Sequence, residues 1–307
     1  MIKYIIRRTV VAVPLILAIA TIVFVMLRVA LPGDPAKIMA GDRASPELIE
    51  QIRENLGLDR PVPEQYVIFL RNAVQGDLGR SVKFREPVLG VIAKAFPFTA
   101  TLTLLSVGAG TVLGIIVGII TAVKRGTWID HLSIVLVVFF YSIPTFWLGL
   151  MLILIFAVAL RWLPVQGTGT WQHFVMPVVT LGIGQAALIA RLTRSSMIEI
   201  LSAHYIQTAR AKGLRERWVI LRHALKNTLI PVITVVGLSI GGLLGGAVIT
   251  ESIFGLPGVG RLAIEAIHNR DYPMIQGTVL LVATAFVFVN LVVDVIYVYI
   301  DPRIRYE

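Results

Sequence analysis

Residues 204–231 are a basic, weakly amphipathic segment in a chain that is otherwise mostly apolar. The basic residues in it are Arg210, Lys212, Arg215, Arg217, Arg222 and Lys226. Long apolar runs flank the segment, so the positive-inside rule places it in water on the cytoplasmic side of a membrane. Such a loop can bind a cytoplasmic protein, or it can be basic only because cytoplasmic loops usually are. Charge alone leaves both interpretations open.

The order of residues predicts two short helices that meet at Gly213. Ser196 and Glu199 have the spacing of a capping box, which predicts a helix that continues to Ala211. Glycine supplies the positive φ that ends many helices. Helical spacing then resumes over residues 216–225. Its apolar stripe consists of Trp218, Leu221 and Leu225.

Residues that could support catalysis or bind a metal are scattered. The five histidines fall in loops and at the ends of apolar runs: His131, His173, His204, His223 and His268. The absence of cysteine excludes disulfides and cysteine metal sites. The phosphate-binding pattern G-x-x-x-x-G-K-[ST] does not occur. These observations disfavour an enzyme and predict no metal or other cofactor in this chain.

The composition is that of a polytopic membrane protein. The 307 residues are 56% apolar and 15% charged, with a mean hydropathy of +0.82. Soluble domains average about 45–50% apolar and about 25% charged residues. The net charge of +10 reflects 28 Lys and Arg against 18 Asp and Glu. Much of this excess lies at the borders of apolar runs, so we assign it to membrane topology rather than to nucleic-acid binding.

Six apolar runs are expected to cross the membrane. They cover residues 9–27, 98–123, 131–160, 174–192, 228–249 and 277–300. The first is longer than the apolar core of a signal peptide, about 7–15 residues, and we interpret it as an anchor. The third exceeds the roughly 20 residues needed to cross and contains Pro144, so it is one kinked helix or two short ones. Counting it as one crossing keeps the basic loop inside and places both termini in the cytoplasm.

These runs define the expected domain organisation. Residues 1–31 form an N-terminal transmembrane anchor, and residues 32–97 form a periplasmic helical segment. Residues 98–300 form a domain of five spans with a cytoplasmic loop at 194–227, and residues 301–307 form a cytoplasmic tail. Helices are expected within residues 45–57 and 63–74 of the periplasmic segment. The segment is small for an independent domain, so we expect it to pack against the outer ends of the spans.

Two spans carry glycines at every fourth position. Gly110, Gly114 and Gly118 lie in the second span, and Gly237, Gly241 and Gly245 lie in the fifth. This small-xxx-small spacing lets helix backbones approach closely where lipid provides no hydrophobic drive. Glycine is also common in membrane helices generally. We favour contact faces, formed within the chain or with a partner.

Residues 251–276 are expected on the outer side and contain many turn signals. The residues that mark a possible periplasmic gate are Glu251, Gly255, Pro257, Gly258 and Gly260, followed by a short helical pattern to Ile267. A hinge-bearing element at a pore mouth can act as a gate. An ordinary re-entrant connector is an equally good interpretation.

Asn290 and Asp294 lie one turn apart in the last span, and Asp294 is about 10 Å inside the inner membrane edge. A carboxylate inside a bilayer usually faces the bundle interior or a watery path, which makes these two residues candidates for a translocation path. A structural pair near the inner interface is an equal alternative. The spans otherwise carry almost no charge, which argues against an ion-coupled carrier.

Residues 204–231 resemble the Glu-Ala-Ala loop of ABC importer permeases, a helix-turn-helix that docks into the ATPase subunit. Gln207, Thr208 and Ala209 occupy the Glu-Ala-Ala positions, and Gly213 is the loop glycine. The loop has the form found in the dipeptide, oligopeptide, glutathione and nickel permease branch, namely TARAKG, then nine residues, then HALKN. That branch lacks the proline that the general family has at the position of Lys226. Further motifs of that branch are PGDP (32–35), QGDLG (75–79), ESIFGLPGVG (251–260), RDYP (270–273) and DPRIRY (301–306).

The resemblance implies an all-α integral membrane protein with six transmembrane helices. The fold would be that of a type I ABC importer permease, with a helical periplasmic insertion between the first two spans. The chain would be the first permease subunit of a bacterial dipeptide or oligopeptide importer in the inner membrane. The implied ATPase-coupling residues are Gln207, Thr208, Ala209, Arg210, Ala211, Lys212, Gly213, Leu214 and Leu225.

The resemblance also implies partners. These are a second, related permease, two ATPases that hold ATP and Mg, and a periplasmic binding protein that delivers a peptide or a related molecule such as glutathione. Solute selection in this group depends largely on the binding protein. Import of a non-peptide solute such as nickel by the same fold is an alternative, and an ion-coupled secondary transporter is an alternative of a different class.

Overall fold

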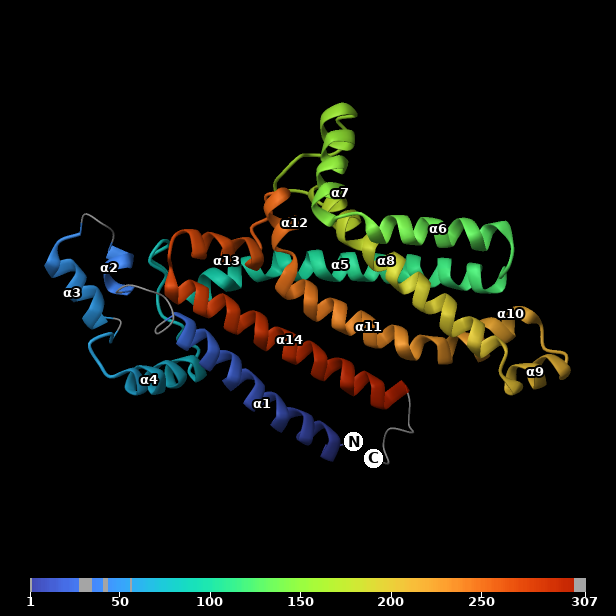
Figure 1. Cartoon of the computed structure of the whole chain (residues 1–307), viewed down its shortest axis with the longest axis horizontal. Helices are drawn as coiled ribbons and strands as arrows, with labels where there is room; N and C mark the ends of the chain where they lie inside the picture. Colours follow the sequence, from blue (N-terminus) through green and yellow to red (C-terminus); the bar gives the residue numbers. More distant parts are fainter. Residues whose placement is uncertain (1, 28–34, 41–43, 56, 301–307) are drawn as a thin grey trace. The chain divides into compact units, whose positions relative to one another are not determined.

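The computed structural model describes residues 2–27, 35–40, 44–55 and 57–300. The secondary structure in these ranges is helical, apart from an isolated antiparallel bridge between Arg80 and Pro87. The described chain divides into two compact units: unit 1 contains residues 100–256 and 288–300, and unit 2 contains residues 2–99 and 257–287. The all-α class predicted from the sequence is confirmed (Figure 1).

Unit 2 contains α1 (Ile2–Val25), α2 (Pro35–Ala40), α3 (Pro46–Asn55), α4 (Val62–Val74), the start of α5 (Val88–Val123), α13 (Val259–His268) and the first part of α14 (Tyr272–Ile300). Helices α1 and α4 contact each other through aromatic rings. The Phe24 ring centroid lies 5.2 Å from that of Tyr66 and 5.7 Å from that of Phe69. A separate buried core, which includes Val88, Ile92, Val259 and Met274, joins the start of α5 to α13 and α14.

Asp271 connects the segment before α5 to the start of α14 within unit 2. Its carboxylate accepts hydrogen bonds from the Ser81 hydroxyl and from the backbone N–H of Lys83 (3.2 Å). Its other oxygen accepts from the Met274 N–H (3.2 Å), the position expected of a helix N-cap. The buried Asp271 therefore satisfies backbone donors at a helix start and fixes the preceding segment to it.

Unit 1 contains the rest of α5, α6 (Trp128–Ser142), α7 (Thr145–Leu152), the π-helix η2 (Ile153–Ala159), α8 (Gln172–Leu201), α9 (His204–Ala211), α10 (Glu216–Trp218), the π-helix η3 (Val219–Ala224), α11 (Leu225–Gly246), α12 (Val248–Ile253) and the last part of α14. Helix α8 is the common partner, since it packs against α6, α7 and α11 (Figure 1).

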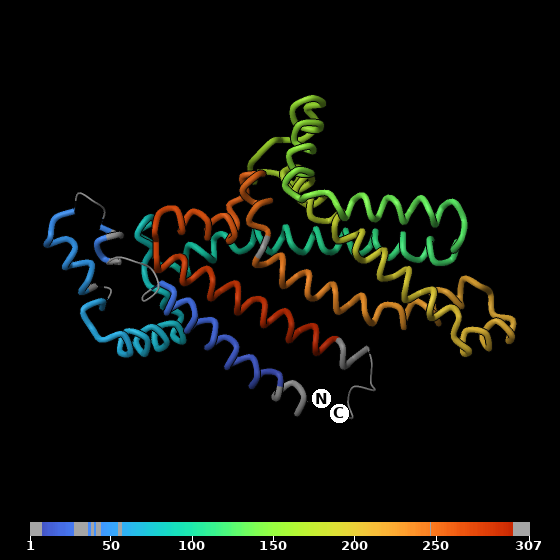
Figure 2. The backbone as a smooth tube through the Cα atoms, in the orientation of Figure 1, coloured from blue at the N-terminus to red at the C-terminus, as the bar shows by residue number. Residues whose placement is uncertain are grey.

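Five described helices are long and apolar enough to cross a membrane. A sixth span results if residues 128–142 and 145–159 are counted together, and these two helices are bent by 96° relative to each other (Figure 2). The bend falls where Ile143 is extended, with φ −72° and ψ 125°, directly before Pro144. A residue before proline is disfavoured in the α region, which explains the break. Of the two forms that the sequence allows, two helices at a sharp angle are observed.

The glycines of α5 lie against α8. A Cβ placed on Gly110, Gly114 or Gly118 would lie 2.6, 2.7 and 2.8 Å from the carbonyl oxygens of Gly182, Ala186 and Ala190, respectively. No real side chain tolerates such distances, so the two backbones meet at a separation that only glycine permits.

The glycines of α11 are less uniform. Any Cβ on Gly237 would overlap the side chain of Val293 in α14. Gly241 is buried, whereas Gly245 is exposed. Because Gly237 and Val293 both belong to unit 1, the contact at Gly237 is formed within the chain.

The capping-box prediction is wrong. Ser196 and Glu199 lie inside α8, which continues to Leu201 because Met197 extends its buried face. The new helix, α9, begins at His204 after an extended Ala203, with φ −69° and ψ 147°.

The expected boundary between residues 97 and 98 falls within α5, which runs without interruption from Val88 to Val123.

We expect Gly114→Ala to destabilise the fold, because the added methyl group would meet the Ala186 carbonyl and the Ile189 Cβ, each at 2.7 Å. Overpacking of this kind costs about 1–3 kcal/mol. Gly108→Ala on the same helix is the matched control, because no atom lies within 4 Å of its added Cβ. Thermal unfolding of the purified protein in detergent should show a lower midpoint for Gly114→Ala alone. Equal midpoints would contradict close packing of α5 on α8.

Candidate functional site

The loop between α8 and α11 is a helix-turn-helix in which Gly213 makes the turn. Gly213 has a φ of +75°, so the predicted positive φ is confirmed. Its N–H donates to the Arg210 carbonyl (2.9 Å), and the N–H of Leu214 donates to the Ala209 carbonyl (3.4 Å). This pair of hydrogen bonds is a Schellman motif, which satisfies carbonyls at the end of α9. No atom lies within 4 Å of a Cβ built on Gly213, so backbone conformation rather than lack of space favours glycine there.

A bidentate ion pair closes the turn. Arg210 donates from Nη2 to Glu216 Oε1 (2.6 Å) and from Nε to Glu216 Oε2 (3.1 Å). The Glu216 carboxylate beside it raises the pKa of Arg210 further above its usual range. Two parallel bonds fix the orientation of both side chains as well as their distance. The end of α9 and the start of α10 are therefore held together across Gly213.

The inner face of this loop rests on an apolar cluster within unit 1. Ile206 and Ala209 of α9 are buried with Val219 and Ala224 of η3. Met197 of α8 and Ala122 of α5 complete the cluster. Burial of apolar area stabilises such a cluster by about 25 cal/mol per Å². The loop is consequently a packed extension of α5 and α8.

The predicted coupling residues divide into two groups. Those on the surface are Gln207, Thr208, Arg210, Ala211, Lys212, Gly213 and Leu214, whereas Ala209 and Leu225 face the cluster. Trp218 and Leu221 are predicted from their spacing to share one apolar stripe with Leu225. Both are exposed, at 49% and 58%, so the loop presents apolar as well as basic groups to solvent.

A partly buried ion pair beside this loop was not predicted from the sequence. Arg194 of α8 donates from Nε to Asp130 Oδ1 (2.7 Å) and from Nη2 to Asp130 Oδ2 (2.9 Å). Asp130 lies in the first turn of α6 and also accepts from the Gly126 N–H (3.0 Å). The two residues are 64 positions apart, so no local pattern could have paired them.

The expected gate residues fall in both units, and each part is described by itself. In unit 1, Glu251 is fully buried in α12, and Gly255 has a φ of +64°. Gln166 covers this turn and donates from Nε2 to the Ile253 carbonyl (3.3 Å). In unit 2, Gly258 is the N-cap of α13, and Gly260 is buried in its first turn.

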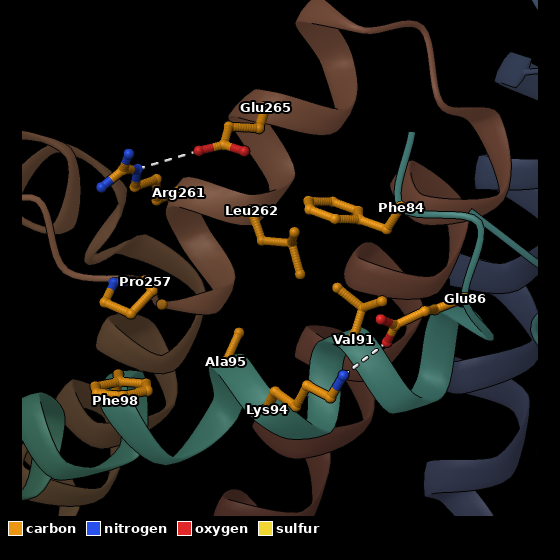
Figure 3. A pocket seen from close by; sticks show the side chains of 11 residues that line it. Phe84, Glu86, Val91, Lys94, Ala95, Phe98, Pro257, Arg261, Leu262 and Glu265 are labelled. Carbon is orange, nitrogen blue, oxygen red and sulfur yellow. Dashed lines mark hydrogen bonds and ion pairs between the residues drawn. The ribbon is translucent and has the colours of Figure 1, made fainter. Parts of the chain in front are cut away.

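A cavity of about 410 Å³ lies in unit 2, and Pro257 and Gly258 belong to its wall. Figure 3 shows Phe84, Val91 and Leu262 around the same space, with an ion pair on either side. Lys94 donates to Glu86 (2.7 Å) on one side, and Arg261 donates to Glu265 (3.2 Å) on the other. A hydrogen bond from Lys83 (2.9 Å), above all, and the nearby Arg261 lower the pKa of Glu265. The cavity has an apolar floor and a rim of matched charges.

Asn290 and Asp294 lie in the part of α14 that belongs to unit 1, and both are partly buried. Among the described residues, no group of three or more His, Asp and Glu is placed to hold a metal ion.

Two family models match the chain. Residues 114–306 match the binding-protein-dependent transport system inner membrane component family, and residues 1–103 match the N-terminal part of such membrane components. The chain therefore belongs to this family. It is a multi-pass inner-membrane transport subunit rather than an enzyme.

Curated relatives match over the full length. The glutathione transport system permease protein GsiC of Escherichia coli (strain K12) is 45% identical over 307 residues, which is 100% of both chains. The protein of the same name from Shigella dysenteriae serotype 1 (strain Sd197) is 45% identical over the same span. The chain is similar to these permeases of ABC importers along its whole length.

Solved structures share the fold at low identity. A chain of the MetNI methionine ABC transporter in an inward-facing conformation matches with a TM-score of 0.56 and 21% identity, covering 69% of this chain and 97% of that one. A chain of an amino acid ABC transporter solved with histidines matches with a TM-score of 0.53 and 15% identity, covering 68% and 93%. The predicted type I permease fold is confirmed.

We expect Glu265→Gln to destabilise the protein at neutral pH and not in strong acid. Because the pKa of Glu265 is lowered in the fold, its contribution is complete above the unfolded-state pKa and is lost as pH falls through the folded one. The side chain is 34% exposed, so the effect at neutral pH should be at most about 1 kcal/mol. The free energy of unfolding of the wild type and of Glu265→Gln, measured from neutral pH to strong acid, tests this prediction. Glu64→Gln, in the exposed Arg60–Glu64 pair, is the control, and a difference that persists in strong acid would contradict the assignment.

Proposed function

We propose that this chain carries a dipeptide, an oligopeptide or a related peptide such as glutathione across the bacterial inner membrane in an ATP-driven importer. The full-length identity of 45% to glutathione permeases supports the peptide class. Import of a non-peptide solute such as nickel by the same fold is the second candidate, because that branch shares the TARAKG and HALKN form of the loop. Family membership disfavours an ion-coupled carrier.

The observation that carries the proposal is the construction of the loop around Gly213. Its turn is closed by the Arg210–Glu216 pair, and its inner face is fixed to α5 and α8 by buried apolar side chains. Its outer face offers exposed basic residues beside Trp218 and Leu221. An exposed helix-turn-helix with apolar side chains and surrounding charges has the composition of a protein-docking surface. We assign its partner as an ATPase subunit.

The complete importer in this proposal contains a second, related permease, two ATPases and a periplasmic binding protein. ATP and Mg are held by the ATPases. When ATP closes the ATPases, the docking loops are pulled together and the solute cavity formed by the two permeases opens outward. The peptide delivered by the binding protein then enters.

The remaining assignments follow the expected topology. Residues 1–31 are the anchor, residues 32–97 are the periplasmic segment, residues 98–300 are the transmembrane domain, and residues 301–307 are a cytoplasmic tail, with both termini inside. Glu251, Gly255, Pro257, Gly258 and Gly260 form the outer gate. Asn290 and Asp294 line the translocation path.

We expect a topology reporter fused near Gly213 to register as cytoplasmic and one near Gly57 to register as periplasmic. The basic residues around Gly213 favour the inner side. Alkaline phosphatase and green fluorescent protein fusions at both positions distinguish the two sides. An outside signal at Gly213 would overturn the six-span topology.

We expect Gly213→Val to uncouple transport from ATP hydrolysis, and Gly213→Asn to preserve coupling. Valine is strained at a φ of +75°, by about 1 kcal/mol or more, whereas asparagine tolerates the left-handed region. A Cβ at this position meets no atom within 4 Å, so the two variants differ mainly in the backbone conformation that they tolerate.

The measurement uses the complete complex in proteoliposomes. The Gly213→Val complex should still bind the peptide-loaded periplasmic binding protein from outside. It should lose its ATPases on purification or fail to drive uptake. Full uptake by Gly213→Val, or uptake by this chain with no ATPase present, would show that the loop is only a basic connector.

A further inference from the structure

The Asp130–Arg194 pair is more buried than an ordinary surface ion pair. The side chain of Asp130 is 4% exposed, and that of Arg194 is 26% exposed. Both carboxylate oxygens accept from Arg194, and Oδ2 also accepts from the Gly126 N–H. Taking charges out of water is costly, so a pair like this is weak evidence for stability alone. Its geometry points to another purpose, since two parallel bonds fix orientation as well as distance.

Arg194 lies on α8 next to the apolar cluster on which the docking loop rests. Arg194 and Met197 are three residues apart on α8 and therefore neighbours on its surface. Met197 is buried against Ile206 of α9 and Val219 of η3. A displacement of the loop is thus a displacement of the turn of α8 that carries Arg194.

The other end of the pair leads to α12 through contacts within unit 1. Asp130 lies in the first turn of α6, and α7 follows α6 after the bend at Pro144. Gly149 of α7 packs against Phe254, since a Cβ on Gly149 would lie 3.3 Å from its ring. Phe254 is 1% exposed and directly follows α12, which contains the buried Glu251.

We propose that Asp130 and Arg194 are positioning residues for energy coupling. Helix α8 packs on α6, α7 and α12, and the pair fixes the orientation of α6 on α8, so that loop movement reaches α7, Phe254 and α12 in a defined direction. This inference rests on the proposed function, in which the loop docks an ATPase and the segment after α12 is part of the gate. Spatial continuity alone does not establish coupling, which must be measured. The pair acts through other residues and contacts neither ATP nor peptide.

The first test compares Asp130→Asn, Arg194→Gln and the charge-exchanged double variant Asp130→Arg with Arg194→Asp in the reconstituted complex. We expect both single variants to retain their ATPases and hydrolyse ATP, while the peptide imported per ATP falls at least tenfold. The double variant should recover a substantial part of this ratio. Glu64→Gln, which breaks an exposed pair in unit 2, is the control and should leave the ratio unchanged.

The second test observes movement directly and does not depend on transport. The chain contains no cysteine, so spin labels can be placed at Ser202→Cys in the turn before α9 and at Ser252→Cys in α12, both exposed positions. In the wild-type background, ATP should change the distance between each label and a fixed label on a neighbouring subunit. In Asp130→Asn, the change at residue 202 should remain and the change at residue 252 should be much smaller than in the wild type.

The outcomes separate this inference from the proposed function. A wild-type complex without ATP-dependent uptake would overturn the proposed function. A wild-type complex that couples, together with Asp130→Asn that couples equally well or moves equally at residue 252, would overturn only the positioning role. Proportional loss of assembly, ATP hydrolysis and uptake, without recovery in the double variant, would also overturn it, because that pattern marks a residue needed only for folding.

Discussion

Lipid tails are as apolar as leucine, so helices in a bilayer cannot be held together by the removal of apolar surface from water. What remains is close contact, and in unit 1 the glycines of α5 provide it along the carbonyls of α8. Each added Cβ there would lie within 2.6–2.8 Å of a carbonyl oxygen, so the separation of these helices depends on the absence of side chains. The positions of the other unit 1 helices follow, because α8 is the surface on which α6, α7 and α11 pack.

Helix α8 also connects the spans to the cytoplasmic loop. It continues to Leu201, and Met197 near its end is shared with α9 and η3. The loop therefore has no independent hinge at its base other than the short turn before His204. Its own turn at Gly213 is fixed by the Schellman motif and by the Arg210–Glu216 pair. The inner face of the loop is thus packed on α5 and α8, and its turn is closed by its own hydrogen bonds.

Local signals predicted much of this structure. Apolar runs predicted the spans, Pro144 predicted the break between α6 and α7, and Gly213 predicted the turn with positive φ, because each depends only on residues that are close together in the sequence. The capping box at Ser196 failed because burial of Met197 kept α8 helical, so tertiary packing overrode a local preference. The Asp130–Arg194 pair depends on the approach of α6 to α8, which no local pattern contains.

The contacts in unit 1 differ in the forces that they can transmit. Close packing at Gly114 resists compression strongly, but it resists separation weakly because dispersion attraction falls off within about 1 Å. A buried bidentate pair resists separation and rotation as well, because moving either partner leaves a buried charge without its hydrogen bonds. A subunit driven by a separate ATPase must transmit movement in both directions of a cycle. Packing of α5 on α8 resists compression of those two helices, and Asp130 with Arg194 resists separation of α6 from α8.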